Sequence, residues 1–214
     1  MTHLLGGNGA ALIRARGLAA AIQTSLERVY ALDRAADIED HLDVTGTDER
    51  EQVELHEADD GAFEIAVRVP QIDQSEFDFG DPSCLDPLCQ LIEGVSHFVY
   101  LTQRVTQERP TTQLELEVQA EVDKYVILAG HLPKFGAVQS EKLRERLYEL
   151  VRYGDEEATL HGERYRYANE VAHRYVRRLE GEYIEPQRFL ELRAELRSFY
   201  RMGQEAKLRS ATGR

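Results

Sequence analysis

Apolar side chains recur every three to four residues from Ala10 to Leu32, a spacing that places them on one face of an α-helix. The sequence then becomes acidic and rich in turn-forming residues over "LDRAADIEDHLDVTGTDERE", residues 32–51. We therefore predict an N-terminal helix followed by a linker or a long surface loop.

The next segment alternates apolar and polar residues, as a half-buried β-strand does. Val53 and Leu55 precede the stretch "ADDG" at 58–61, and an alternating run from Phe63 to Val69 follows it. Asp-Gly between two alternating runs is a strong hairpin signal. Two strands alone are not stable in water, so this hairpin must pack on helices or extend a sheet.

From about residue 84 the apolar spacing is helical to near the end of the chain. Ser140 has the residue type and position of an N-cap, and "GD" at 154–155 has those of a second cap. The tail "KLRSATGR" has no such pattern and is predicted to fray. The predicted helices cover residues 86–108, 112–132, 140–153, 155–180 and 186–204.

The breaks between these helices are short, which favours antiparallel neighbours in a bundle. The fold class that we predict is mainly α: an antiparallel helical bundle with an N-terminal helix and one small β-hairpin. Residues 1–82 would hold the N-terminal helix, the acidic loop and the hairpin. Residues 83–214 would hold the helical bundle, and the two parts would form one compact unit.

Composition adds the class of protein and its expected location. The chain has 214 residues, of which 42% are hydrophobic and 30% charged, which is typical of a globular domain. No apolar run approaches the roughly 20 residues that span a bilayer, and arginines interrupt the most apolar part of the N-terminus. We expect a cytoplasmic protein without a membrane segment.

The net charge of −13 is distributed unevenly. Residues 1–100 carry six arginines and 20 acidic residues, a net charge of −14, whereas residues 101–214 are nearly neutral. The acidic half would suit a basic protein partner, and nucleic acid is not an expected partner. A local basic surface could still run along Arg193, Arg197 and Arg201.

Two glutamates of the predicted helix 112–132 are candidate metal ligands. Glu121 falls inside the apolar stripe of that helix and Glu117 lies just off its edge. A glutamate that points into a bundle is costly unless it is paired or coordinated. Glu121 is therefore either a metal ligand or the partner of an arginine across the bundle.

Histidines on two other helices extend the candidate metal site. Glu93 and His97 are four residues apart, on the face of their helix opposite its apolar stripe. This spacing fits either two metal ligands or a surface pair. His161 falls inside the apolar stripe of the helix 155–180. If the metal hypothesis holds, carboxylate and histidine ligands of this kind would bind iron, manganese or zinc.

The stretch "RYANEVAH", residues 166–173, contains an E-x-x-H pair, Glu170 and His173, of the type that di-iron bundles use. Helical phase turns Glu170 outward, which weakens that interpretation. Arg166, Asn169 and His173 instead share the rim of the helix. Arg-x6-His on a bundle helix resembles the motif of HEPN-type ribonucleases, although Tyr167 stands where that family usually has a polar residue.

That resemblance implies metal-free RNA cleavage, with His173 as general acid or base, Arg166 stabilising phosphate charge and Asn169 orienting the substrate. The first function that we predict is nevertheless a non-catalytic interaction or regulatory protein that binds another protein. No catalytic constellation is complete, and the hairpin edge could pair with a partner strand. A metal-binding bundle enzyme and a HEPN-like ribonuclease are the alternatives, and a homo-oligomer is compatible with the sequence.

Overall fold

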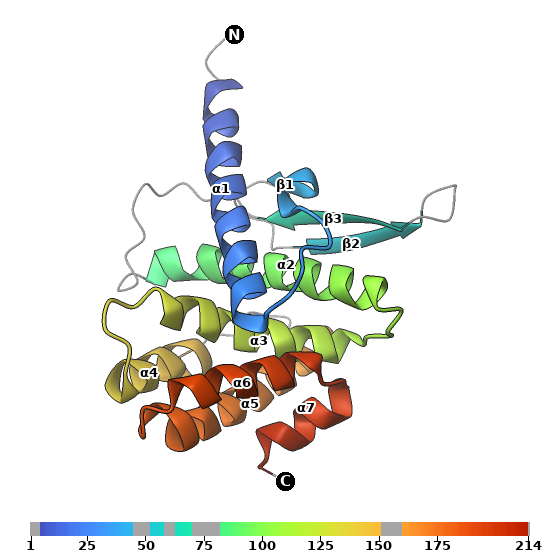
Figure 1. The fold of residues 1–214 in the computed structure, drawn as a ribbon. Helices are drawn as coiled ribbons and strands as arrows, with labels where there is room; N and C mark the ends of the chain where they lie inside the picture. Colours follow the sequence, from blue (N-terminus) through green and yellow to red (C-terminus); the bar gives the residue numbers. More distant parts are fainter. Residues whose placement is uncertain (1–4, 45–51, 58–62, 70–81, 151–159, 214) are drawn as a thin grey trace. The chain divides into compact units, whose positions relative to one another are not determined.

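The computed structural model describes residues 5–44, 52–57, 63–69, 82–150 and 160–213 (Figure 1). This part of the chain is mainly helical, with an N-terminal helix and a small mixed sheet, as the sequence predicts. None of its helices is long and apolar enough to cross a membrane. The elements are α1 (Leu5–Tyr30), η1 (Ile38–Asp40), β1 (Leu42–Val44), β2 (Gln52–Glu57), β3 (Phe63–Val69), α2 (Pro82–Thr106), α3 (Gln113–Gly130), α4 (Ala137–Arg144), η2 (Glu145–Glu149), α5 (Leu160–Leu179), η4 (Glu180–Ile184), α6 (Phe189–Arg201) and α7 (Gln204–Ala211).

The contacts within the chain define two units. Unit 1 contains residues 1–26 and 33–107, which include most of α1, the sheet and α2. Unit 2 contains residues 27–32 and 108–214, so the last turn of α1 belongs to it together with α3 to α7. Each unit has its own buried side chains.

The sheet of unit 1 has the strand order β1-β3-β2. β2 and β3 pair antiparallel, which confirms both strands of the predicted hairpin, while its "ADDG" turn lies outside the described residues. β1 pairs parallel to β3, with Leu42 opposite Val67. The sequence missed this strand, because three residues in an acidic stretch carry too short a pattern to detect.

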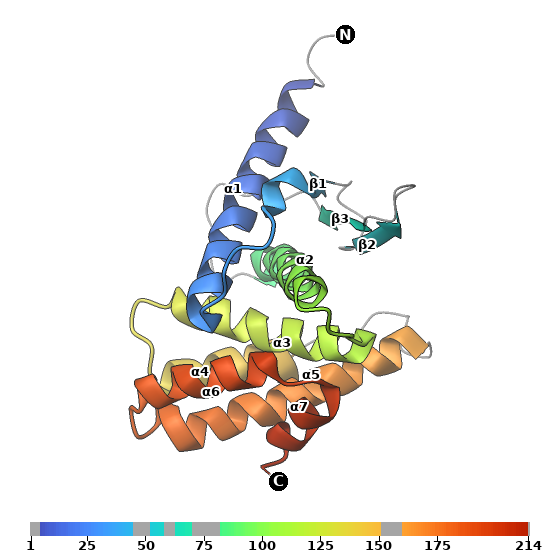
Figure 2. The same ribbon diagram turned by 45° about the vertical axis from the view of Figure 1, so that its right-hand side comes forward.

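One face of the sheet packs against α2 within unit 1 (Figure 2). Ile65, Val67 and Val69 alternate along β3 and are all buried, as the period of a strand requires. The ring of His41 lies 5.1 Å from that of Phe98 on α2. The core of unit 1 therefore lies between β3 and α2.

The buried side chain of Gln23 connects α1 to the start of η1 in unit 1. The side chain of Gln23 donates to the carbonyl of Ala36 at 2.7 Å and accepts from the backbone N–H of Ile38 at 2.9 Å. Gln23 is 2% exposed, so its amide replaces water for two backbone groups at the entry to η1.

In unit 2, α3 is the central helix. α5, α4 and α7 all contact it, and Figure 2 shows α3 and α5 side by side. Thr112 caps α3 by accepting from the N–H of Glu115 at 3.1 Å. Stacked rings complete this core: Tyr30 lies 4.3 Å from Tyr200, and Tyr175 lies 3.9 Å from Phe199.

Two predicted helix boundaries of unit 2 are wrong. Gly136, not Ser140, is the N-cap of α4, and Ser140 lies fully buried inside that helix. The tail expected to fray forms α7, in which Lys207 is 1% exposed. Both errors have one cause. Serine typically caps a helix and lysine typically lies at the surface, but here Ser140 bonds to Tyr125 and Glu180, and Lys207 bonds to Gln119, in the interior. The predicted cap at 154–155 lies outside the described residues.

Two helices of unit 2 end in π-helical turns. In η2 the N–H of Leu150 donates to the carbonyl of Glu145 at 3.0 Å, and in η4 the N–H of Glu185 donates to that of Glu180 at 2.9 Å. Such i→i+5 turns are rare and often occur at functional positions. Both turns contribute a glutamate to the same buried arginine, described below.

Candidate functional site

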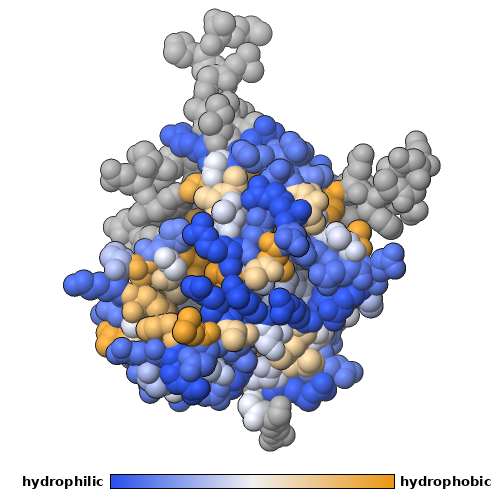
Figure 3. Space-filling view, viewed as in Figure 1, coloured by the Kyte–Doolittle hydropathy of each residue, from blue (hydrophilic) through white to orange (hydrophobic). Residues whose placement is uncertain are grey.

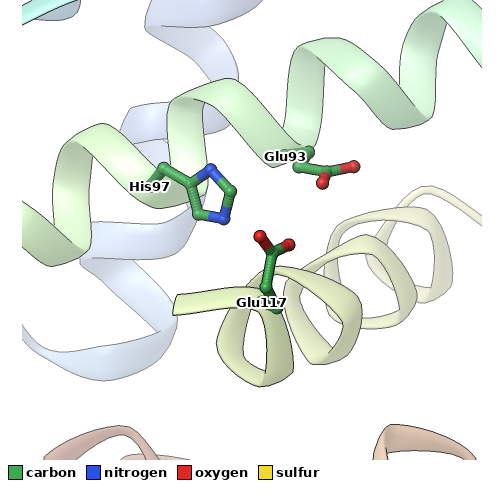
Figure 4. A group of neighbouring side chains, drawn as sticks. All are labelled: Glu93, His97 and Glu117. Atoms are coloured by element: carbon green, nitrogen blue, oxygen red, sulfur yellow. The ribbon is translucent and has the colours of Figure 1, made fainter. Parts of the chain in front are cut away.

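The first group of candidate residues lies on α2 in unit 1. Every residue from Leu91 to Tyr100 is buried, so α2 has no solvent-exposed face over this stretch. Glu93 and His97 are 2% and 8% exposed, and Figure 4 shows both side chains on one side of the helix, a turn apart. A carboxylate oxygen of Glu93 and a ring nitrogen of His97 lie within 4.8 Å of each other.

The expectation of a surface pair at these positions is therefore wrong. Helical phase correctly separated Glu93 and His97 from the main apolar stripe of α2. The error lay in assuming that the opposite face meets water. A helix buried on every side carries polar residues only where their charges and hydrogen bonds are compensated, so these two positions have a specific role in the structure.

The two candidate glutamates of α3, Glu117 and Glu121, lie in unit 2; both are buried, and each has a cation near it. Glu121 accepts from Lys124 Nζ at 2.8 Å, and Lys124 also donates to the hydroxyl of Tyr165 at 3.2 Å. Glu117 lies 3.9 Å from the guanidinium of Arg164. The inward direction predicted for Glu121 is confirmed, and among the described residues it forms an ion pair with a lysine on the same helix. The side chain of His161 lies outside the described residues.

A second polar group of unit 2 surrounds Arg144 at the end of α4. Arg144 donates from Nε to Glu180 at 2.7 Å, and it also donates to Glu149. Ser140 donates to the other carboxylate oxygen of Glu180 at 2.6 Å, and Tyr125 lies 2.6 Å from the Ser140 hydroxyl. Glu149 and Glu180 come from the two π-helical turns, η2 and η4.

His173 of α5 forms the outer edge of this group. Its Nε2 lies 2.9 Å from Arg144 and 3.2 Å from Glu149, and its ring stacks on Tyr148 at 5.8 Å. Burial, and then the charge of Arg144, lower the pKa of His173 from its usual 6.5. A neutral imidazole that accepts a hydrogen bond from Arg144 fits this environment. The charge of Arg144 is balanced by its ion pairs with Glu149 and Glu180. The group is therefore built to join α4, α5 and the two π-helical turns.

The structure distributes the three residues of the ribonuclease hypothesis differently from the sequence pattern. Arg166 is exposed, Asn169 is 6% exposed and His173 faces Arg144. They do not share one solvent-facing surface. Glu170 is exposed and forms an ion pair with Arg174, which confirms its outward direction.

Sequence reasoning missed a third buried polar group in unit 2, which joins three helices. Tyr30 at the end of α1 donates to Asp123, and Lys207 of α7 donates to Gln119. The ammonium of Lys207 also lies 4.5 Å from the ring centre of Phe199. Asp123 and Gln119 stand one turn apart on α3, and that i,i+4 pairing is the signal that could have identified the group.

These groups differ in the chemistry they offer. The groups around Arg144 and Lys207 consist of cations held by carboxylates and amides, an arrangement that stabilises a fold. Glu93 and His97 are the side-chain types that divalent transition metals prefer, and they lie on one helix face.

In comparisons with known proteins, no family model, no curated protein and no solved structure matches this chain.

Proposed function

We propose that the protein binds a divalent transition-metal ion through Glu93 and His97 of α2. The observation that supports this most strongly is the proximity of a buried carboxylate and a buried imidazole, whose ligand atoms lie within 4.8 Å. A carboxylate oxygen and an imidazole nitrogen bound to one zinc ion are roughly 3.4 Å apart, because each bond is about 2.1 Å long. A small rotation of either side chain about its own bonds would bring both to one ion.

The helix itself favours this pair. Residues i and i+4 lie one above the other on an α-helix, so the backbone holds both ligands in place before the metal arrives. Burial lowers the local dielectric constant and so strengthens the attraction between the carboxylate and a cation. A neutral imidazole and one carboxylate suit zinc, manganese or iron(II), and water or other side chains would complete the coordination.

Metal content is the direct test. Purified full-length protein is stripped with a chelator, reconstituted separately with Zn²⁺, Mn²⁺ and Fe²⁺, dialysed and measured by elemental analysis. We expect close to one ion per chain for at least one of these metals. Glu93→Gln and His97→Ala should each reduce the bound metal at least tenfold, since each removes one ligand.

Matched controls separate ligation from general effects. Glu170→Gln and His131→Ala change an exposed glutamate and an exposed histidine and should leave the metal content unchanged. Glu121→Gln should also retain the metal, because the carboxylate of Glu121 is engaged by Lys124. The sequence also names Glu117 as a candidate ligand, and the metal content of Glu117→Gln decides whether it is one.

A second measurement guards against variants that fail to fold. A metal ion that binds the folded protein and not the unfolded chain stabilises the fold by about 2.7 kcal/mol when its free concentration is about 100 times the dissociation constant. For a chain of this size, that should raise the melting temperature of the protein by roughly 5–10 °C. Substituted Co²⁺ should give visible absorption bands that Glu93→Gln shifts. Wild-type protein that remains metal-free after reconstitution, with no change in melting temperature, would refute the proposal.

A further inference from the structure

Unit 2 carries a group of exposed apolar side chains beside the beginnings of α4 and α6. Val138, Phe189 and Leu190 are 57%, 43% and 82% exposed. The ring of Phe135, just ahead of α4, lies 6.4 Å from that of Phe189 at the start of α6, so the two segments are neighbours. Figure 3 shows hydrophobic surface gathered at this place. We call these four residues the α4–α6 face.

Arginines follow this apolar group along α6. Arg193 and Arg201 are exposed, and with Leu190 they continue one row of the helix at spacings of three and eight residues. These are two of the three arginines whose spacing the sequence singled out. The third, Arg197, is half-buried and donates from Nε to the carbonyl of Val29 at 2.8 Å.

The acidic residues of α6 do not offset this charge. Glu191 forms an ion pair with Arg188 at 3.3 Å, and Glu195 forms one with Arg178 of α5. The outward charges of Arg193 and Arg201 therefore give the row a positive potential next to apolar anchors. That combination is complementary to a segment with apolar residues on one side and acidic residues around them.

We propose that the α4–α6 face binds an acidic amphipathic helix of a protein partner. Leu190 and Phe189 would contact the apolar side of that helix, and Arg193 and Arg201 would pair with its carboxylates. Exposed leucine and phenylalanine at one place, with charge of one sign beside them, are typical of a surface that another protein covers. The inference is independent of the metal proposal, because all of these residues lie in unit 2 and none is a candidate metal ligand.

Two synthetic 16-residue peptides test this. Both carry leucine along one helical side; one has glutamate and the other lysine at the remaining polar positions. Binding to full-length protein is followed by fluorescence anisotropy and by the amide shifts in NMR spectra. We expect saturable binding of the glutamate peptide, at least tenfold tighter than the lysine peptide, with shifts confined to residues 134–142 and 188–201. Raising NaCl from about 50 to 200 mM should weaken it.

Variants distinguish the apolar from the charged contribution. Leu190→Glu should weaken binding of the glutamate peptide at least tenfold, and the double variant Arg193→Glu, Arg201→Glu should reverse the preference towards the lysine peptide. Val105→Glu replaces an exposed valine on α2 and should change nothing. All of the substituted side chains are exposed, so the variants should fold as the wild type does. Circular dichroism checks this for each variant.

Three outcomes would overturn the proposal. The first is no saturable binding of the glutamate peptide up to about 1 mM. The second is dimerisation in sedimentation velocity that Leu190→Glu abolishes, which would assign the face to a second copy of this chain. The third is binding of an RNA oligonucleotide that depends on Arg193 and not on Leu190, which would assign the arginine row to nucleic acid.

Discussion

The ion pair between Arg144 and Glu180 should be strongly coupled, because both side chains are only 10% exposed. In Arg144→Met the Glu180 carboxylate loses its cation and keeps the hydrogen bond from Ser140. Breaking a buried pair from one side costs about 3–5 kcal/mol, and we expect about 3 here because Ser140 remains. Glu180→Gln should cost about 2 kcal/mol, since Arg144 keeps Glu149 as a partner.

The assay is a double-mutant cycle in urea, followed by circular dichroism at neutral pH. If the pair acts as one unit, Arg144→Met with Glu180→Gln should lower the free energy of unfolding by about 3 kcal/mol rather than about 5. That difference corresponds to a coupling of about 2 kcal/mol. The dependence of the free energy on urea concentration should be similar in all four proteins.

The exposed pair of Arg174 and Glu170 is the matched control. Its side chains are 53% and 54% exposed, so the same cycle should give a coupling of about 0.5 kcal/mol or less. The reasoning fails if the costs of the two buried substitutions simply add, or if the exposed pair couples as strongly as the buried one.

Three further predictions concern unit 2. Because the pKa of His173 is lowered, the folded protein binds fewer protons than the unfolded chain near pH 6. The free energy of unfolding should therefore fall as the pH drops through about 6.5. In urea titrations between about pH 7.5 and 5.5, His173→Gln should flatten this pH dependence. Glu115 accepts from the N–H of Gln204 at 2.9 Å, so Glu115→Ala should speed hydrogen exchange in α7 and cost about 1 kcal/mol, whereas unchanged exchange would exclude a capping role. Phe199 is completely buried, and Phe199→Ala should lower the free energy of unfolding by about 3–5 kcal/mol; a cost below about 1 would contradict the described core.

The elements with a long regular pattern were predictable from the sequence. Helix α1, the strands β2 and β3, and helices α2 and α3 lie within a few residues of their predicted positions. Each carries several turns or alternations of apolar residues, so no tertiary contact is needed to identify it. The strand β1 and helix α7 are short, and their positions depend on the neighbours Val67 and Gln119, which local pattern does not reveal.

The candidate sites were predictable in residue type and less so in environment. Helical phase placed Glu121 inside and Glu170 outside, and both are found so. It failed for Glu93 and His97, because the method assigns each helix one buried side and α2 is buried all round from Leu91 to Tyr100. The sequence pattern does not single out Arg144. Its partner Glu180 lies 36 residues further along the chain, and the phase of one helix cannot reveal a contact between two helices.

The π-helical turns η2 and η4 also affect how this sequence would tolerate change in length. A π turn holds one residue more than the α turn it replaces, so the side chains after it are rotated by about 100° relative to an uninterrupted helix. Deleting Gly181 would remove that extra residue and restore ordinary α pairing in η4, so Tyr183 and Ile184 should keep close to their present directions. A single-residue deletion in η4 should therefore disturb the fold less than one inside α5 or α6, where no extra residue absorbs the change in helical phase.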